Sequence, residues 1–576
     1  MNQLLLKFIT ITGYFHSVYS LDVINNGDID KRLNYLQPPG TQPPCSSEIY
    51  CHGKLLHTVQ MAKLYSDSKT FVDMRMKESP DDTLAKFDDF MNAHNGNPTK
   101  TEIQHWVEEN FDKPGAEFED WTPSDWKEHP VFLDRIKDDS LKDFAKKLNG
   151  IWLQLGRKMI SDVETNGEKY SIIHVDNPVI VPGGRFREFY YWDSYWIVRG
   201  LLLSEMKTTT RGMLENFLSI VRRFGFIPNG GRVYYAMRSQ PPLLAPMIKS
   251  YVEFTKDEDF ARQSVETLEH EFEYWMNNHV TEVKGHQLAF YGDKSNGPRP
   301  ESYREDYESA QTLKTEAERE EYYSELKAAA ESGMDFSSRW FIDEKGGNSG
   351  DLTTMRCRSI IAVELNAILW WNAKIIAEFY RLANNVKKSA DFETKATELF
   401  DGIQAVLWNE EKGAWFDYDL INKKHREYFV PTNLSPLWMG CYNQADSTNL
   451  TTKVLKYIED NQLDKYPGGV PNTLSHTGEQ WDFPNVWPPM QYILIWGLDG
   501  LKDERAKSLA YKWAERWVLS NQAAFKDGEH MYEKYNAEEF GGHGGGGEYG
   551  VQLGFGWSNG VVMDLLDKYG DKMTSG

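Results

Sequence analysis

The sequence predicts an all-α protein, on three observations. Apolar residues recur at spacings of three and four in several long stretches, which is the period of an amphipathic helix. Strand-like alternation is rare and short, as around residues 414–418. Strands and helices do not alternate regularly, which disfavours a doubly wound sheet or a β/α barrel. Successive helices of this kind predict antiparallel pairs packed into one large helical barrel.

Five apolar stripes mark helices in chain order. Residues 255–258 precede the second stripe and match a capping box, the signal for a helix start. The third helix, over residues 359–382, is apolar around much of its girth, so we expect it to be buried on more than one side. The stripes are Leu141, Phe144, Leu148, Trp152 and Leu155; Ala261, Val265, Leu268, Phe272 and Trp275; Ile361, Leu365, Ile368, Ile375, Phe379 and Leu382; Phe392, Ala396, Leu399, Ile403 and Val406; Ala506, Leu509, Trp513 and Trp517.

Long segments rich in Gly, Pro, Trp and charged residues separate these helices. Structureless connections of this length are uncommon in a compact domain and are usually functional. We therefore expect them to gather at one end of the barrel around a single pocket. The segments are 180–196, 225–245, 291–306, 331–351, 465–492 and 530–560.

The N-terminal region has the features of a secretory signal. Residues 1–20 are mostly apolar, although Lys7 interrupts the run, and small residues precede a cleavage point before Leu21. A buried N-terminal helix is the alternative interpretation. Residues 21–52 form a Pro-rich extension, and residues 53–576 are predicted to be a single barrel domain.

Secretion would give two sequence features a role. Asn449 begins an N-glycan acceptor motif, and Asn433 begins a second one that is weakened by the following Pro436. Cys45 and Cys51 are close enough in sequence to bridge a small loop. The predicted location is therefore extracellular.

Composition excludes some functions. The 576 residues carry a formal charge of −22, which disfavours binding to nucleic acid or to an anionic membrane. No apolar run after the N-terminus reaches the roughly 20 residues of a membrane span, and no C-terminal tail suggests a lipid anchor. Aromatic residues make up 14% of the acidic chain, which suggests carbohydrate binding because flat rings stack on sugars and carboxylates bind hydroxyl groups. Aromatic core packing is the alternative.

The cysteines and histidines do not form a metal motif. The chain has four cysteines and lacks both the CxxC and the HExxH spacing of zinc sites. Cys357 and Cys441 lie in apolar or aromatic surroundings and are predicted to be buried thiols. We therefore expect no metal and no disulfide scaffold.

The Gly-rich run at residues 541–547 invites comparison with a phosphate-binding loop. That interpretation fails because Glu548 and Tyr549 follow where the loop would need Lys and Ser or Thr. Such a run instead allows the backbone to approach a ligand or to move as a lid. A flexible connection is the alternative.

Asp335 and Glu533 are carboxylates with apolar or aromatic neighbours in sequence. Burial raises the pKa of a carboxyl group, which a general acid near neutral pH needs, and glycoside hydrolysis needs two carboxyl groups. Neither segment is specific alone, because the chain has 86 acidic residues and such surroundings arise by chance.

Two segments are more distinctive: residues 182–196 (PGGRFREFYYWDSYW) and residues 480–489 (QWDFPNVWPP). They closely resemble the two signature segments of the trehalase family, the α,α-trehalose hydrolases. The resemblance extends in the family's order from about residue 50 to the C-terminal region. It includes GFIPNG at 225–230, RSQPP at 238–242, RPES at 299–302, ESGMDFSSRW at 331–340, EKY at 533–535, GGGGEY at 544–549 and GFGWSNG at 554–560.

The resemblance implies a barrel of six α-hairpins and an inverting mechanism. It makes Asp335 the general acid and Glu533 the general base, with carboxyl groups roughly 6.5–9.5 Å apart. It implies neither a metal nor an organic cofactor, and no protein partner. The sugar contacts that it implies are Arg185, Trp192, Asp193, Asn229, Arg238, Gln240, Arg299, Glu301, Gly333 and Glu548.

Some residues depart from the family pattern. Met334 stands where the family usually has Trp, which puts stacking at that position in question, and Gly550 and Leu553 differ in the last loop. None of these is an assigned catalytic group, so we still expect activity. The arginines at 187, 304 and 339 are assigned supporting roles, because an ion pair that supports a loop is the commoner use of a single Arg.

The sequence thus predicts a secreted, inverting α,α-trehalase that releases two glucose molecules. One alternative is a hydrolase of another α-glucoside on the same barrel. Another is an inactive trehalose-binding protein, although a binder would have no need of both Asp335 and Glu533.

Overall fold

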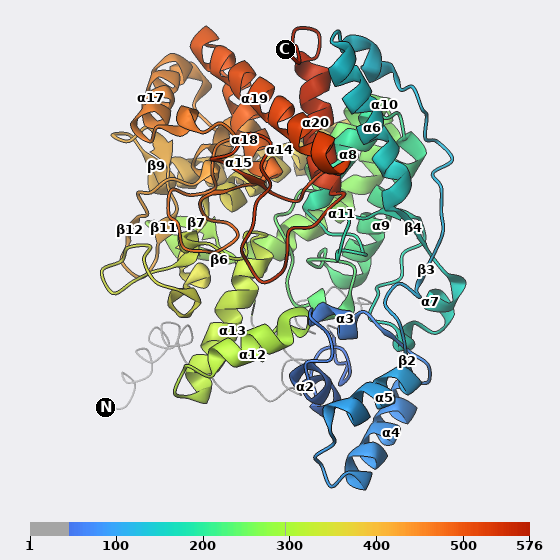
Figure 1. The fold of residues 1–576 in the computed structure, drawn as a ribbon. Coiled ribbons are helices and arrows are strands. Elements are labelled where there is room, and N and C mark those ends of the chain that lie inside the picture. The colour runs from blue at the N-terminus through green and yellow to red at the C-terminus, as the bar shows by residue number, and fades with distance from the viewer. Residues whose placement is uncertain (1–44, 294) are drawn as a thin grey trace, which may run out of the picture.

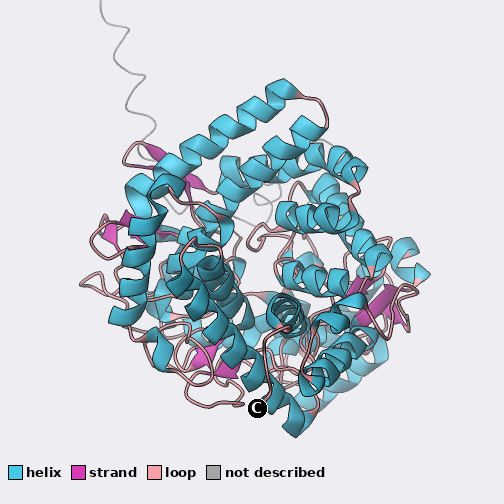
Figure 2. Ribbon diagram, turned by 90° about the horizontal axis from the view of Figure 1, so that it is seen from above, coloured by secondary structure: helices cyan, strands magenta, loops and turns pink. Residues whose placement is uncertain are grey.

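The computed structural model describes residues 45–293 and 295–576, which fold around two concentric rings of helices (Figures 1 and 2). Each inner helix contacts the next, and the last packs against the first, so the inner ring closes. The inner helices are α8 (Asp193–Leu203), α10 (Leu244–Thr255), α14 (Val363–Leu382), α16 (Ser435–Met439), α18 (Pro488–Asp499) and α20 (Gly556–Tyr569).

An outer helix precedes each inner helix along the chain, which gives six helix pairs within the described residues. The all-α prediction and the barrel of six α-hairpins are confirmed. The outer helices are α6 (Asp139–Leu155), α9 (Lys207–Phe224), α11 (Glu258–Asn278), α15 (Val386–Gly402), α17 (Ser447–Asp460) and α19 (Glu504–Gly528).

The two rings differ in burial as their sequences predict. Helix α6 buries every residue of its apolar stripe and exposes much of its other side, which is typical of an outer helix. Helices α18 and α20 are buried over nearly their whole length, because neighbours surround them. Helix α14 is also buried on more than one side, as predicted, and only Leu509 of the α19 stripe stays half-exposed.

Two predicted helix boundaries are wrong. Helix α14 begins at Val363 rather than residue 359, because the preceding residues pair as strand β8 (Ile360–Ile361) with β11 (Tyr418–Asp419). Helix α11 is capped by the carboxylate of Asp257, which accepts from the Phe260 amide at 3.1 Å. Thr255 of the predicted capping box is instead the last residue of α10.

The strands are short, and the paired strands are antiparallel. The predicted strand character near residues 414–418 is confirmed by β10 and β11. The remaining strands are β1 (Arg75–Met76) paired with β2 (Phe111–Asp112), the sheet β3 (Phe118–Glu119), β4 (Gly156–Met159) and β5 (Val179–Ile180), the hairpin β6 (Val280–Val283) and β7 (His286–Ala289), β9 (Trp408–Asn409) with β10 (Ala414–Trp415), β12 (Lys424–His425) beside β11, and β13 (Asn485–Val486) with β14 (Tyr535–Asn536).

Residues 45–112, called here the N-terminal segment, pack with Tyr190, Tyr234 and Tyr235 of the barrel's loops into a small apolar core beneath the barrel in Figure 1. A disulfide joins Cys45 and Cys51 at its start. Its helices are α2 (Lys54–Met61), α3 (Lys69–Val72), α4 (Pro80–Ala93) and α5 (Lys100–Asn110). Helix α7 (Ser161–Thr165) follows β4, and α12 (Tyr303–Ala310) and α13 (Glu316–Glu331) lie between α11 and α14 in the chain.

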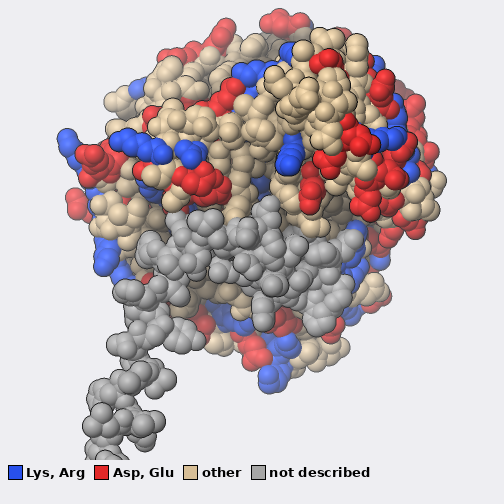
Figure 3. Space-filling view, turned by 90° about the horizontal axis from the view of Figure 1, so that it is seen from below, with Lys and Arg blue, Asp and Glu red and all other residues tan. Residues whose placement is uncertain are grey.

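The predicted signal at residues 1–20 and most of the extension at residues 21–52 lie outside the described residues. The domain boundary at residue 53 stays a prediction. Cys357 and Cys441 are buried free thiols, as predicted. Among the described residues, none of the helices combines the length and the apolar character needed to span a bilayer. Among the described residues that Figure 3 shows, acidic and basic side chains are interspersed on the surface.

Candidate active site

All six of the long segments predicted from the sequence contribute side chains to one pocket. The pocket lies at the N-terminal ends of several inner helices: Asp193 is the first residue of α8, Trp487 caps α18, and Trp557 is the second residue of α20. Burial raises the pKa of Asp193 well above its usual value, and the nearby Glu533 and Asp335 add to that rise.

The structure brings all twelve of the predicted site residues to this pocket. They are Arg185, Trp192, Asp193, Asn229, Arg238, Gln240, Arg299, Glu301, Gly333, Asp335, Glu533 and Glu548.

Asp335 faces the pocket, and its side chain keeps 29% of its surface exposed there. Desolvation of the carboxyl group within the pocket raises the pKa of Asp335 to about 7. Arg299 acts in the opposite direction but lies 3.8 Å away, and it is engaged more closely by Glu548 at 2.7 Å and Asp306 at 2.6 Å. Asp335 is therefore able to carry a proton near neutral pH.

Glu533 is almost completely buried, and one of its carboxylate oxygens accepts from the Tyr549 hydroxyl at 2.9 Å. Its other oxygen, Oε2, has no hydrogen-bond partner among the described residues. Burial raises the pKa of Glu533, while the neighbouring Lys534 and the Tyr549 hydrogen bond oppose that rise. An unpartnered carboxylate oxygen in a polar pocket can accept a proton from water.

Arg238 and Glu301 form a buried ion pair on the pocket wall, with Nη2 donating to Oε1 at 2.5 Å. Each also keeps one buried polar atom without a partner among the described residues: Nε of Arg238 and Oε2 of Glu301. Unpaired buried polar groups are costly, so a donor and an acceptor are held ready for a polar ligand such as a sugar hydroxyl.

Trp192 lies in a cluster of indoles, with ring centroids 5.6 Å from Trp196 and 5.7 Å from Trp557. Its backbone amide donates to the Gln240 side chain at 3.0 Å. The Asn229 side chain donates to the carbonyl of Ala330 at 3.0 Å and thereby joins the 225–245 segment to the last turn of α13.

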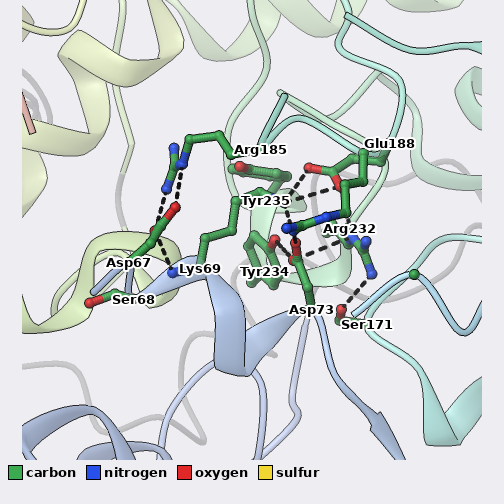
Figure 4. A network of polar contacts seen from close by, with 12 residues as sticks. Asp67, Ser68, Lys69, Asp73, Ser171, Arg185, Glu188, Arg232, Tyr234 and Tyr235 are labelled. Carbon is green, nitrogen blue, oxygen red and sulfur yellow. Dashed lines mark hydrogen bonds and ion pairs between the residues drawn. The ribbon is translucent and has the colours of Figure 1, made fainter. Parts of the chain in front are cut away.

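Arg185 reaches the pocket from the first signature segment and pairs with Asp67 of the N-terminal segment (Figure 4). The three arginines assigned supporting roles are not in the pocket lining. Arg339 is fully buried between Asp417 and Glu364, at 2.7 Å and 2.6 Å.

Met334 resolves one question raised by the sequence. Its side chain is buried, with its sulfur 3.2 Å from an Arg339 nitrogen, and it does not line the pocket. The Met therefore fills space behind Asp335 and does not remove a stacking surface from the site.

Sequence reasoning missed several residues of the site. Trp481 and Trp487 lie in the second signature and stack with centroids 3.8 Å apart, so the signature contained a signal for them. Tyr549 follows an assigned residue, but its contact with Glu533 spans 16 positions. Asp67 lies 118 positions from Arg185 and carried no local signal. The other unassigned lining residues are Phe186, Tyr190, Tyr235, Ser302, Ala330, Phe555 and Trp557.

No group of three or more His, Cys, Asp or Glu side chains with the geometry of a metal site occurs in the part of the chain that the structure describes. The candidate site consists of carboxylates, arginines, amides and indoles.

Glycoside hydrolases use a pair of carboxyl groups in one pocket, and Asp335 and Glu533 both line this pocket. The trehalase family model matches residues 63–570, so the chain belongs to the trehalase family. The chain is 56% identical to the trehalase of Apis mellifera (covering 92% of this chain and 86% of that protein) and 46% identical to that of Homo sapiens (93% and 91%). The solved neutral trehalase of Saccharomyces cerevisiae shares the fold, with a TM-score of 0.55 at 24% identity over 68% of this chain and 73% of that one.

Proposed function

We propose that this protein hydrolyses α,α-trehalose to two glucose molecules, with inversion at the attacked anomeric carbon. The observation that supports this best is the pairing, in one pocket of a trehalase-family chain, of two carboxyl groups in different surroundings. Burial raises the pKa of Asp335 to about 7, and the neighbouring Arg299 is ion-paired with Asp306 and Glu548. Glu533 has one carboxylate oxygen without a hydrogen-bond partner among the described residues.

In the proposed reaction, Glu533 takes a proton from a water molecule as the water oxygen bonds to the anomeric carbon. The bond from that carbon to the bridging oxygen breaks, and Asp335 gives its proton to the departing oxygen. The attacked ring leaves as β-glucose, and the other ring keeps its α configuration. The proposed reaction uses only trehalose, water and the two carboxyl groups, and it needs no cofactor.

The remaining pocket residues are proposed to bind the two sugar rings. Arg238 and Glu301 supply a buried donor and acceptor for hydroxyl groups, and the ion pair of Arg299 with Glu548 supplies further polar atoms on the pocket lining. Trp192 offers an apolar face. The same role is proposed for Arg185, Asp193, Asn229, Gln240 and Gly333.

A glucose-release assay on trehalose tests the proposal. Asp335→Ala and Glu533→Ala should each lower kcat by about 10²- to 10⁴-fold, the usual contribution of an acid–base group. Glu344→Ala is the matched control, because Glu344 is an exposed carboxylate outside the pocket lining and should leave the rate unchanged.

The same assay separates the alternatives. NMR of the first products should show equal amounts of α- and β-glucose if the reaction inverts. Release of α-glucose alone would refute inversion. Maltose should be ignored; comparable hydrolysis of maltose would indicate a broader α-glucosidase. Trehalose binding without turnover by the wild type would indicate an inactive binder.

We also propose that the protein is secreted. The Cys45–Cys51 disulfide supports this, because disulfides persist in oxidising compartments. Asn449 is exposed at the start of α17 and so is open to glycosylation. Expression in insect cells should place the protein in the medium with Leu21 as its first residue; retention in the cytosol with residues 1–20 intact would contradict the proposal.

A further inference from the structure

Asp67 holds Arg185 by two hydrogen bonds. Nε and Nη2 of Arg185 donate to the two carboxylate oxygens of Asp67, each at 2.7 Å (Figure 4). Burial acts to raise the pKa of Asp67, but the Arg185 guanidinium holds it below its usual value, so Asp67 is ionised. A fork of this kind fixes the plane of the guanidinium, and Nη1 makes no hydrogen bond to any described residue.

The position of Asp67 is itself fixed. It precedes α3, and Lys69 of that helix is buried against Asp73 at 2.5 Å and Glu188 at 2.9 Å. Arg232 also contacts Glu188, at 3.0 Å, on the far side of this network (Figure 4). Buried charges of this kind need all their partners, so α3 is tied to the loops around Glu188 and Arg232.

On its other side, Arg185 contacts the Gly-rich loop. Its guanidinium carbon lies 4.5 Å from the centre of the Tyr549 ring, and its backbone amide donates to the Gln552 side chain at 2.7 Å. Tyr549 in turn donates to Glu533, and the Gln552 carbonyl accepts from the Glu533 amide at 3.0 Å. Contacts therefore run without a break from Asp67 through Arg185 and this loop to Glu533.

We propose that Asp67 is a positioning residue for hydrolysis: it fixes Arg185, which holds the loop of Tyr549 and Gln552 closed over the pocket and thereby orients Glu533. The N-terminal segment is then part of the active site rather than a separate appendage. This inference rests on the proposed function, because it assigns Glu533 as the base.

A purely structural ion pair is the competing explanation, and two variants separate it from positioning. Asp67→Ala removes the clamp. Asp112→Ala removes the carboxylate of a second Arg–Asp pair in the same segment, which contacts Arg75 at 3.1 Å and is outside the pocket lining. Both changes remove one ion pair from the N-terminal segment, but only the first lies beside the pocket.

Asp67→Ala should lower kcat/KM for trehalose by about 10- to 100-fold, the equivalent of one charge-assisted hydrogen bond. Asp67→Asn, which keeps one acceptor oxygen, should fall between it and the wild type. Asp112→Ala should match the wild type. In an Arg185→Ala background, Asp67→Ala should have no further effect, because Asp67 acts through Arg185.

Hydrogen–deuterium exchange gives a readout that needs no turnover. The amides of residues 541–552 should exchange faster in Asp67→Ala than in the wild type or Asp112→Ala, while exchange in the rest of the barrel stays unchanged. Unchanged exchange of this loop, or rate losses that multiply in the double variant, would overturn the proposal. If the wild type released no glucose, the proposed function would fail, and the exchange experiment would still decide whether Asp67 holds the loop.

Discussion

Gly333 allows the sharpest test of how the pocket holds Asp335. Its φ angle of +73° lies in the left-handed region, and a Cβ atom added there would stand 2.6 Å from Cε2 of Trp192. Trp192 cannot move aside easily, because Trp196, Trp481 and Trp557 surround it with ring centroids 5.6–5.9 Å away. In Gly333→Ala the backbone must therefore shift, and Asp335 is two residues further along.

Two effects should lower the free energy of unfolding of Gly333→Ala. A non-glycine residue in the left-handed region costs about 1–2 kcal/mol. Forcing a methyl group into a packed indole cluster costs about 1–3 kcal/mol more. A shift of about 1 Å at the acid would lower kcat/KM by about 100-fold, because catalysis depends on the geometry of the reacting groups.

Gly297→Ala is the control that separates these effects. Gly297 has a φ angle of +74°, and nothing lies within 4 Å of its added Cβ. It should show the backbone cost alone, as a modestly lower unfolding midpoint in urea with unchanged kinetics for trehalose. Gly333→Ala should lose both stability and rate. Equal kcat/KM values for the two variants would refute the claim that Trp192 fixes this backbone.

Three other predictions follow from single contacts. Tyr549→Phe removes a hydrogen bond that lowers the pKa of Glu533, so the acidic limb of the kcat/KM profile should move to higher pH; an unmoved limb would contradict the contact. Arg339→Met leaves two buried carboxylates without their cation and should cost about 3–5 kcal/mol in urea unfolding; a wild-type midpoint would refute this. In protein secreted from insect cells, Asn449→Gln should remove a glycan mass, whereas Asn433 should carry none because it is buried and its side chain donates to Tyr457; a glycan at Asn433 would be the contrary result.

The fold was accessible to sequence reasoning because each ring of the barrel has its own pattern. An outer helix such as α6 shows one apolar face, and a buried inner helix such as α14 is apolar around much of its girth. The errors arose at helix ends, where single contacts decide. Asp257 rather than Thr255 caps α11, and two residues before α14 pair as a strand instead of extending the helix.

The site was accessible where its residues lie in distinctive segments, and inaccessible where a role depends on tertiary contact. Asp335 and Glu533 lie in segments that resemble those of the trehalase family, and both line the same pocket. Asp67 has no such mark, because its importance arises only when Arg185 folds against it. The N-terminal segment likewise shows its relation to the pocket only in three dimensions.

The placement of Arg299 explains how a pocket with a buried cation can still contain a carboxylic acid. A cation close to Asp335 would favour its ionised form and leave no proton for the leaving group. Arg299, however, is paired closely with Asp306 and Glu548, and Asp335 lies at the longer distance of 3.8 Å. Two carboxylates thus partner Arg299, and although Arg299 still lowers the pKa of Asp335, burial outweighs it and the pKa rises to about 7. Glu533, which must be ionised for its proposed role as base, is buried as well, and burial raises its pKa, but Lys534 and the Tyr549 hydroxyl oppose that rise. The proposed acid and base roles of the two carboxyl groups thus rest on their different neighbours in the pocket.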